Sequence, residues 1–373
     1  MAVERDSESA TQPHARYSAR ARQQHVAPLW EFFHEWFPAL PKTDAVAYLW
    51  HYDALRPLLG EAAALISAED AERRVLALEN PGLPGGRLAT DALYAGLQLI
   101  VPGEIAPSHR HSAAALRFIV EGHGAYTAVE GERAYMEPGD FIVTPSWTWH
   151  EHGNEGGAPA VWLDVLDVAL VRFLGAGFSE RYPGGRFAER APRGDSQHRF
   201  GQNMRPVDFV PGTRASPVFH YPYARAREVL ETLRGDGEWD ACHGLKMAYV
   251  DPTTGGPAIP TLATFLQLVP AGFRTSPYRS TASAVYAVVE GRGHAIIGEA
   301  NATALEFGPR DLFAVPSWQP LVVEASEDVV VFSASNEAVQ QRLGVWREAR
   351  GAGAGAGAAG ADDSARFPAT GAT

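Results

Sequence analysis

The sequence is poor in the groups that stabilise small secreted proteins and in those that bind nucleic acids. It has a single cysteine, Cys242, so no disulfide can form within the chain. Any metal must therefore be held by histidine or carboxylate side chains rather than by thiolates. Basic residues are in deficit, because 32 Lys and Arg stand against 44 Asp and Glu and give a formal charge of -12. Nucleic acid is thus disfavoured as a partner, since its binding proteins present a basic face.

Long apolar segments are also absent. No run reaches the ~18 apolar residues that a membrane helix needs. Residues 1–26 are polar and lack the apolar stretch of a secretory signal, so we expect a disordered N-terminus and a cytoplasmic protein that does not bind membranes. With 373 residues, of which 46% are hydrophobic, the chain can form one large domain or two ordinary ones.

Residues 95–171 alternate apolar and polar side chains between regularly spaced glycines, which is typical of short β-strands joined by turns. His109 and His111 stand two positions apart, so on a strand both imidazoles point to the same face. His150 follows a Pro-containing turn and can be brought beside them by a later strand. Three structural histidines are the alternative to a metal site here.

A second block, residues 261–348, repeats the first. LQLIVPGEIAPSHRHSAAALRFIVEGHG (97–124) aligns with LQLVPAGFRTSPYRSTASAVYAVVEGRG (266–293), and PGDFIVTPSWTWH (138–150) aligns with PRDLFAVPSWQPL (309–321). The repeat predicts two copies of one β-domain in an all-β dominated chain. At the equivalents of the three histidines we expect Pro277, Arg279 and Leu321, so the second copy lacks metal ligands.

The segments around the two blocks carry other patterns. Residues 27–94 are expected to be mainly helical: LWEFFHEWFPAL as a helix packed on the body, then a helical stretch over 54–77 with Ser67 as a possible N-cap. Residues 172–260 are expected to connect the blocks and to contain one helix, ARAREVLETLRG. Residues 349–373 are Gly- and Ala-rich and predict a flexible tail.

Loss of all three histidines from the second copy favours a metal site in the first. Neutral imidazoles suit Fe, Zn, Cu or Ni, so the ligand type alone does not choose the metal. Three protein ligands leave coordination positions open, which is typical of a catalytic rather than a structural metal.

Two stretches resemble the two signature motifs of cupins, which are jelly-roll β-barrels. They are GEIAPSHRH (103–111) and GDFIVTPSWTWHEHGN (139–154). The glutamate that usually follows the second histidine is missing, since residues 112–117 read SAAALR. Together with AERRVLALENPG and ATFLQLVPAGFRTSPYRST, these stretches resemble the gentisate 1,2-dioxygenase group of bicupins. That group also includes salicylate and 1-hydroxy-2-naphthoate dioxygenases, and the resemblance spans roughly residues 28–345.

The resemblance implies one Fe(II) per chain, held by His109, His111 and His150. It implies insertion of O2 between the carboxyl- and hydroxyl-bearing carbons of gentisate to give maleylpyruvate, in a homotetramer. Salicylate, a substituted salicylate or 1-hydroxy-2-naphthoate are alternative substrates. A non-catalytic small-molecule-binding bicupin and a zinc isomerase or hydrolytic cupin are alternative functions.

Two arginines are candidates to bind the substrate carboxylate. Arg117 follows His111 by six residues, so in an unbroken strand it faces the same interior, although a structural ion pair is the alternative. Arg73 corresponds to a substrate-side arginine of the group, and its alternative is a solvated helix face.

Other candidates surround the same site. His152 is in register with His150 and can move a proton or bond the substrate. Asp164 stands among apolar residues and is expected to orient an arginine or histidine. Gln98 can bind the substrate or form a cross-strand hydrogen bond, and Tyr94 and Trp147 are expected as pocket walls or core. Residues 94–96 are expected to decide between substrates.

Overall fold

The computed structural model describes residues 7–202 and 204–351, which divide into two units at residue 42. The first unit contains α1 (Ser7–Gln23), η1 (Leu29–Glu31) and α2 (Phe33–Trp36). Helix α1 lies where disorder was predicted, and its C-terminal half, ARYSARARQ, is rich in helix-forming Ala, Arg and Gln. The aromatic segment forms two short helices with no buried residues instead of one longer helix. Glu31 ties them back to α1 through an ion pair with Arg22, at 2.9 Å.

The second unit, residues 43–373, holds two pairs of antiparallel sheets. We call the first pair, with sheet orders β12-β8-β5-β10-β3-β2 and β11-β4-β9-β6-β7, the N-terminal barrel. Its strands are β2 (Val75–Ala77), β3 (Tyr94–Ile100), β4 (Ile105–His111), β5 (Ala115–Glu121), β6 (Ala125–Val129), β7 (Glu132–Tyr135), β8 (Phe141–Thr144), β9 (His150–Asn154), β10 (Ala160–Leu166), β11 (Ser179–Arg181) and β12 (His220–Tyr221).

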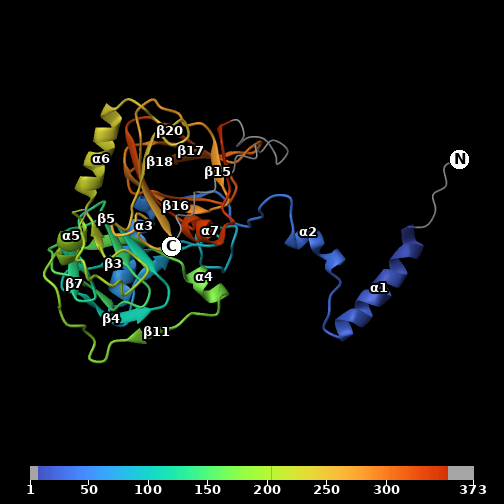
Figure 1. Cartoon of the computed structure of the whole chain (residues 1–373), viewed down its shortest axis with the longest axis horizontal. Helices are drawn as coiled ribbons and strands as arrows, with labels where there is room; N and C mark the ends of the chain where they lie inside the picture. Colours follow the sequence, from blue (N-terminus) through green and yellow to red (C-terminus); the bar gives the residue numbers. More distant parts are fainter. Residues whose placement is uncertain (1–6, 203, 352–373) are drawn as a thin grey trace. The chain divides into compact units, whose positions relative to one another are not determined.

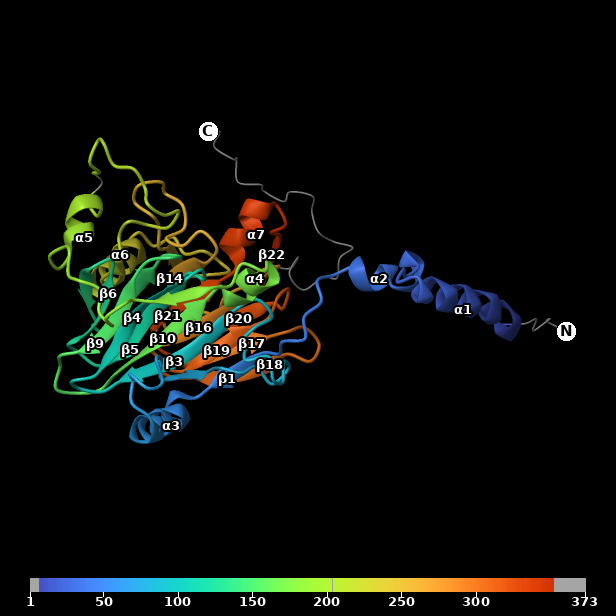
Figure 2. The ribbon, with the colours of Figure 1, turned by 90° about the horizontal axis from the view of Figure 1, so that it is seen from below.

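The second pair, with orders β1-β19-β16-β21-β14-β13 and β18-β17-β20-β15-β22, is the C-terminal barrel. Its strands are β1 (Tyr48–Trp50), β13 (Leu245–Ala248), β14 (Ala263–Val269), β15 (Tyr278–Ser280), β16 (Ala284–Glu290), β17 (Gly293–Ile297), β18 (Thr303–Phe307), β19 (Leu312–Val315), β20 (Leu321–Ala325), β21 (Val329–Ser335) and β22 (Glu348–Arg350). Figure 2 separates the barrels by colour, green and cyan for β3–β10 and orange for β14–β20. The predicted all-β architecture with two copies is confirmed.

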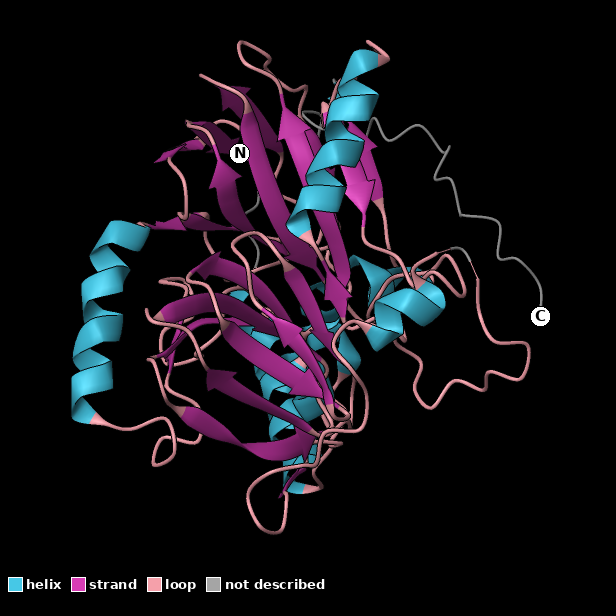
Figure 3. Ribbon diagram, turned by 90° about the vertical axis from the view of Figure 1, so that its left-hand side faces the viewer, coloured by secondary structure: helices cyan, strands magenta, loops and turns pink. Residues whose placement is uncertain are grey.

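Helices accompany the strands at the outside of this unit (Figure 3). They are α3 (Tyr52–Leu65), α4 (Val168–Phe173), α5 (Asp195–Phe200), α6 (Tyr223–Gly235) and α7 (Glu337–Leu343). No helix among the described residues is both long and apolar enough to span a bilayer. The predicted tail falls mostly on residues 352–373, which lie outside the described residues.

The main apolar core lies between the barrels rather than inside either one. Successive strand residues point to opposite faces, so Leu97 and Leu99 of β3 pack toward the other barrel while Gln98 points into its own. Phe118 of β5 stacks on Phe332 of β21, with ring centroids 4.2 Å apart. The two six-stranded sheets therefore stabilise each other face to face.

The two barrel interiors are filled differently. The apolar cluster inside the C-terminal barrel has thirteen buried members, among them Phe307 and Phe313. The corresponding cluster of the N-terminal barrel has eight, with Trp162 the largest. The space that apolar side chains leave in the N-terminal barrel is lined by buried polar residues, including Arg117 and Asp164. This barrel depends on the shared core for stability and has an interior available for chemistry.

Each barrel also contains strands from outside its predicted range, among them β1 and β12. Strand β1, from the N-terminal region, pairs with β19, whereas β12, from the predicted connecting region, pairs with β8. Helices α3 and α6 follow these strands, and the backbone N–H groups of Tyr52 and Tyr223 donate to Asp311 and Asp140 at 2.9 and 2.8 Å. The unit β1–α3 precedes the N-terminal barrel in the sequence but pairs with the C-terminal barrel, and the unit β12–α6 precedes the C-terminal barrel but pairs with the N-terminal one. The two halves of the chain thus exchange equivalent strand–helix units.

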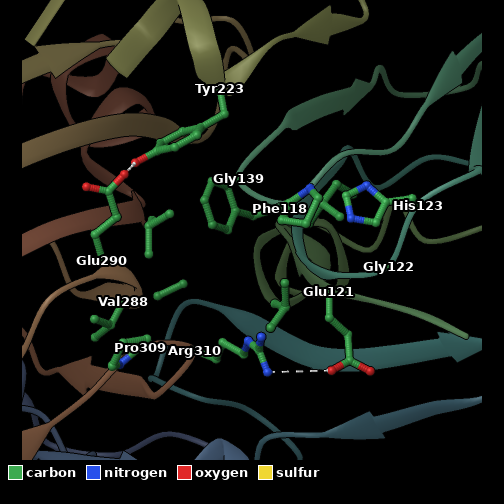
Figure 4. A pocket seen from close by; sticks show the side chains of 15 residues that line it. Phe118, Glu121, Gly122, His123, Gly139, Tyr223, Val288, Glu290, Pro309 and Arg310 are labelled. Atoms are coloured by element: carbon green, nitrogen blue, oxygen red, sulfur yellow. Dashed lines mark hydrogen bonds and ion pairs between the residues drawn. The ribbon is translucent and has the colours of Figure 1, made fainter. Parts of the chain in front are cut away.

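Equivalent segments of the two barrels enclose a cavity of about 390 Å³ (Figure 4). In this view the Tyr223 hydroxyl donates to Glu290, and Arg310 lies toward Glu121, with Nη1 and Oε2 3.9 Å apart. Each carboxylate is also paired with an arginine of a crossing helix, Arg227 for Glu290 and Arg56 for Glu121. The cavity is therefore a junction between barrels whose charges are compensated, and it contains none of the predicted metal ligands.

Two further predictions of local structure were wrong. The stretch 54–77 is not one helix, because α3 ends at Leu65 and β2 begins at Val75, where pairing with β3 overrides the helix propensity of AERRVLAL. In the second copy, the pairing of Tyr278 with Leu321 matches that of His109 with His150. The equivalents of the histidines are therefore Tyr278, Ser280 and Leu321, one residue later on β15 than predicted.

Replacing Phe332 by alanine removes one partner of the Phe118 stack from the shared core. We expect the variant to lose about 3–5 kcal/mol of unfolding free energy, the usual cost of truncating a buried Phe. Urea denaturation followed by fluorescence measures this loss. The matched control is Phe173→Ala, because Phe173 is 86% exposed and its truncation is expected to change stability by no more than about 0.5 kcal/mol. Equal effects of the two substitutions would contradict the assignment of the core.

Candidate metal and substrate site

His109, His111 and His150 meet inside the N-terminal barrel. His109 lies opposite His150 in the pairing of β4 with β9, and His111 follows two residues later on the same face. The ring centroids of His109 lie 5.2 Å from His111 and 4.5 Å from His150, and those of His111 and His150 are 4.8 Å apart. One ligand atom from each side chain fits within a span of 4.8 Å. The three side chains can therefore share one metal ion, and among the described residues no carboxylate joins them.

Backbone carbonyls orient two of the imidazoles. Nδ1 of His111 lies 2.7 Å from the Ala113 carbonyl, and Nδ1 of His150 lies 3.0 Å from the Thr148 carbonyl. Because a carbonyl only accepts, both Nδ1 atoms carry the proton and both Nε2 lone pairs remain available. The buried His150 Nε2 has no hydrogen-bond partner among the described residues. An unsatisfied nitrogen at this position fits a metal ligand with its other ring nitrogen fixed by an outer partner.

The surroundings keep these histidines neutral. Burial, followed by the charge of Arg117 with that of Arg73, lowers the pKa of His111 to about 4. Burial and the neighbouring charges also hold the pKa of His109 and of His150 below the ordinary value. Neutral imidazole is the form that binds a metal, so no proton has to be displaced at neutral pH.

Arg117 of β5 lies beside the histidines and pairs with Asp164 of β10. Its Nε is 3.4 Å from Asp164 Oδ1, and its Nη1 donates to the hydroxyl of Thr144. Asp164 Oδ1 also accepts from Trp162 Nε1 at 3.1 Å. Burial raises the pKa of Asp164 to about 6, against the opposing effect of Arg117. The structural ion pair considered for Arg117 is therefore present, and the charge of Arg117 also lowers the pKa of the three imidazoles. Binding of the substrate carboxylate by Arg117 stays a prediction.

Arg73 reaches the same interior from the turn between α3 and β2. Its Nη2 donates to the carbonyl of Pro107 in β4 at 3.2 Å. Burial and the charge of Arg117 lower the pKa of Arg73 to about 9, which is still well above neutrality. A solvated helix face does not describe this residue, since no helix forms there. Two positive guanidinium groups thus act on one set of neutral ligands.

His152 lies behind the metal ligands and is fully buried. Its Nδ1 is 2.9 Å from the Thr127 hydroxyl, and its ring lies 5.2 Å from that of Trp162. Burial, then the charges of Arg117 and Arg73, holds its pKa well below the ordinary value. Nε2 of His152 has no hydrogen-bond partner among the residues that the structure describes. A neutral imidazole with one unsatisfied nitrogen is suited to bond a ligand in this interior.

Tyr94 and Gln98 line one face of β3, opposite Leu166 and Trp162 of β10. Burial and then the charge of Asp164 raise the pKa of Tyr94 to about 12, so the phenol keeps its proton. A Cβ built on Gly96 would lie 2.5 Å from Val75 Cγ1 and 3.0 Å from the Tyr94 hydroxyl, so glycine here allows both side chains to approach the backbone of β3 closely. Gln98 is buried among these residues.

Trp147 lies with a different group of residues. Its ring packs on Phe178 and under Arg110, with distances of 4.4 and 4.3 Å between centres. The C-terminal barrel repeats this arrangement with Arg279 over Trp318, and both tryptophans have φ 62. Because the copy without metal ligands keeps the pair, a packing role accounts for these contacts, and a pocket-wall role for Trp147 stays a prediction.

Three hydrogen-bond partners at the site were not predicted from the sequence. The hydroxyls of Thr127 and Thr144 and the carbonyl of Pro107 each bond a predicted side chain. Alternation along β6 and β8 could have placed the threonines on the inner face. Their partners depend on strand register, which the sequence does not encode locally.

Substituting His111 by alanine removes one of three ligands. We expect the bound metal, measured by inductively coupled plasma mass spectrometry after gel filtration, to fall below about a tenth of the wild-type content. His123→Ala is the matched control, because His123 is exposed, pairs with Glu137 and is not a member of the three-histidine cluster. Undiminished metal in the His111 variant would exclude the three-histidine site.

The comparisons with known proteins agree with this geometry. A cupin domain model matches residues 96–166. The chain is 47% identical over 342 residues to gentisate 1,2 dioxygenase 1 of Aquipseudomonas alcaligenes, covering 92% of this chain and 98% of that protein. It is 36% identical over 330 residues to 5-aminosalicylate 1,2-dioxygenase of a Comamonas species, covering 87% of each.

Solved structures match as well. The structure of salicylate 1,2-dioxygenase from Pseudoaminobacter salicylatoxidans in its adducts with gentisate superposes with a TM-score of 0.84 at 30% identity. The match covers 93% of this chain and 95% of that one. Identity at this level over nearly the full length of the relatives shows common descent as well as a common fold. The chain therefore belongs to the gentisate 1,2-dioxygenase family of bicupin ring-cleaving dioxygenases.

Proposed function

We propose that the protein is an Fe(II)-dependent dioxygenase that inserts O2 between the carboxyl- and hydroxyl-bearing carbons of gentisate and releases maleylpyruvate. The observation that carries the proposal is the pairing of three neutral imidazoles with two guanidinium groups in one barrel interior. A metal with open positions and fixed positive charge is what an aromatic 2-hydroxy acid requires. The relatives named above for gentisate and 5-aminosalicylate act on acids of this class.

The donor set fits Fe(II), with His109, His111 and His150 as its ligands. When bound there, iron would hold O2 beside the substrate and pass electron density from the ring to O2. The absence of a carboxylate from the cluster supports iron over the zinc of isomerases and hydrolytic cupins, which the resemblance associates with a glutamate ligand.

Arg117 and Arg73 bind and orient the substrate carboxylate in this proposal. Asp164 lies beside Nε of Arg117, and Thr144 accepts a hydrogen bond from Nη1. In this proposal Nη2 is the nitrogen that turns toward the ligand. Because both arginines carry their charge at neutral pH, the anionic acid enters a site that already compensates its charge.

His152 is assigned the proton-handling role. With Nδ1 engaged by Thr127, its buried Nε2 is the atom that bonds the substrate hydroxyl or the developing product. Gln98 and the protonated Tyr94 complete the wall and can donate to a ring substituent or to the carboxylate. Residues 94–96 are proposed to set which ring substituents fit, because the absence of a side chain at Gly96 fixes how closely the Tyr94 hydroxyl approaches β3.

Self-association is proposed as well. Within the first unit, taken by itself, residues 29–40 present a group of large apolar side chains that need a partner surface. They are Leu29, Trp30, Phe33, Trp36, Phe37 and Leu40, with exposures from 37% to 67%. A homo-oligomer, a tetramer by resemblance to the family, would cover them. The number of subunits and the cytoplasmic location stay predictions.

Oxygen uptake tests the reaction directly. Protein loaded anaerobically with Fe(II) is expected to consume one O2 per gentisate and to give a product with the ultraviolet absorbance of a ring-opened enol. Dialysis against a chelator is expected to abolish uptake, Fe(II) to restore it, and zinc to fail. Salicylate, 5-aminosalicylate and 1-hydroxy-2-naphthoate are tested beside gentisate to rank substrates. Absence of uptake with all four acids would favour a non-catalytic binding protein.

Replacing Arg117 by glutamine removes a charged donor but keeps a polar side chain. We expect kcat/KM for gentisate to fall about 100-fold, the effect of losing a charged hydrogen bond in a desolvated site. Arg133→Gln is the control, because Arg133 lies on β7 of the same barrel and pairs with surface glutamates. Metal content is measured in both variants, and loss of metal from the Arg117 variant would indicate a structural role instead.

A further inference from the structure

We propose that the ion pair between the buried Arg74 and the partly exposed Glu104 is a positioning device that holds Arg73 in the metal-bearing barrel. The inference rests on the proposed function, in which Arg73 binds the substrate carboxylate. Neither partner is among the residues predicted to touch the substrate. Arg74 acts through the backbone of its neighbour Arg73, and Glu104 acts through the backbone at the start of β4.

The segment that carries Arg73 has no regular structure to hold it. Helix α3 ends at Leu65 and β2 begins at Val75, leaving residues 66–74 between them. Glu72 has φ 56, a left-handed conformation that is uncommon for residues other than glycine. The Arg73 side chain itself bonds two carbonyls, those of Glu72 and Pro107, at 2.6 and 3.2 Å. Such a segment keeps one conformation when surrounding contacts fix it.

Arg74 supplies those contacts from the next position. It is 4% exposed, and its two terminal nitrogens bond both oxygens of Glu104, at 2.7 and 2.6 Å. The same nitrogens also donate to the carbonyls of Ile66 and Leu99, at 2.9 and 3.1 Å. One guanidinium therefore joins the beginning of the segment, strand β3 and the β3–β4 turn. The Cα atoms of Arg73 and Arg74 are only about 3.8 Å apart, so fixing one restricts the other.

Glu104 is held equally well from the other side. Its two oxygens accept the backbone N–H groups of Ala68 and Val101, at 3.2 and 2.9 Å. Burial alone would raise the pKa of Glu104, but hydrogen bonds from Arg74 and these amides outweigh it and hold the pKa below its ordinary value. The carboxylate remains ionised at neutral pH and bridges the Arg73 segment to the turn that leads into β4, the strand of His109 and His111.

The C-terminal barrel shows that the fold does not require this pair. Val75 pairs with Gln98, and Lys246 pairs with the equivalent Gln267, so Leu245 stands in the place of Arg74. The same register puts Gly244 in the place of Arg73.

The repeat alignment places Phe273 at the position of Glu104. Leu245 belongs to the core between the barrels and Phe273 packs on the apolar interior of the C-terminal barrel, so apolar side chains occupy both positions. The copy without metal ligands has therefore no arginine to position and no ion pair beside it. Buried ion pairs are often replaceable by apolar residues without loss of stability, which makes a purely stabilising role an insufficient reason for the pair.

The decisive variant carries the two apolar residues found at the equivalent positions of the C-terminal barrel, and combines Arg74→Leu with Glu104→Phe. We expect it to fold and to keep its metal, while KM for gentisate rises about tenfold with a much smaller change in kcat. In an Arg73→Ala background the same double change is expected to add no further loss, because residues that act through one another are not additive. Arg56→Ala, which removes the surface pair with Glu121, is the matched control and is expected to leave KM unchanged.

Hydrogen exchange separates this inference from the proposed function. The backbone amides of residues 71–75 are expected to exchange faster in the double variant than in the wild type, and this readout needs no substrate. Unchanged exchange, or unchanged KM in an active double variant, would overturn the positioning role. Failure of the wild type to turn over any of the four acids would overturn the proposed function. The hydrogen exchange of residues 71–75 would still test whether the Arg74–Glu104 pair holds the segment of Arg73. Should the double variant fail to fold, Glu104→Gln and Arg74→Lys, which keep the volume, give the same two readouts.

Discussion

Two guanidinium groups and four imidazoles share the interior of the N-terminal barrel, where Arg117, His150 and His152 are buried and the other three groups are partly exposed. Charge on the histidines would add to that of Arg73 and Arg117 at close range, so burial and repulsion keep the rings neutral. The positive charge of the site therefore resides on the arginines, and the lone pairs reside on the histidines. Metal binding and anion binding are separated in this way between two kinds of side chain.

Polar groups of this density cost stability, and the fold compensates for them outside the barrel that contains them. The N-terminal barrel has the smaller apolar interior, and the large core lies between the two facing sheets. The C-terminal barrel fills its own interior with side chains such as Phe307 and Phe313. One copy of the repeat thus gives up packing to hold a reactive centre, and the other copy restores the packing that a two-layer protein requires.

The sequence was informative where the signal was local or repeated. The alternation of side chains along a strand placed His109 and His111 on the same face, and the internal sequence repeat predicted two barrels with a single set of ligands. It was uninformative where partners are far apart: Tyr48–Trp50 pairs with residues 312–314, and three-residue strands carry no readable periodicity. The Arg74–Glu104 pair was missed for the same reason, because a helix-like sequence around residue 74 concealed an edge strand. In the second copy, the pairing of Tyr278 with Leu321 agrees with the ungapped alignment of 97–124 with 266–293, which puts Tyr278 and Ser280 at the places of His109 and His111.

The exchange of strand–helix units has a consequence for the order of events during synthesis. The N-terminal barrel needs residues up to β12, which ends at Tyr221, whereas β1 waits for β19, which ends at Val315. A chain that emerges from the ribosome therefore contains every strand of the N-terminal barrel while more than a hundred residues remain to be translated, before the shared core that stabilises this barrel is complete. During that interval the sheet face around Phe118 is uncovered, and β1 is a strand without its partner. Translation speed over the second half of the message thus governs how long a nascent chain with a complete ligand set is exposed to aggregation.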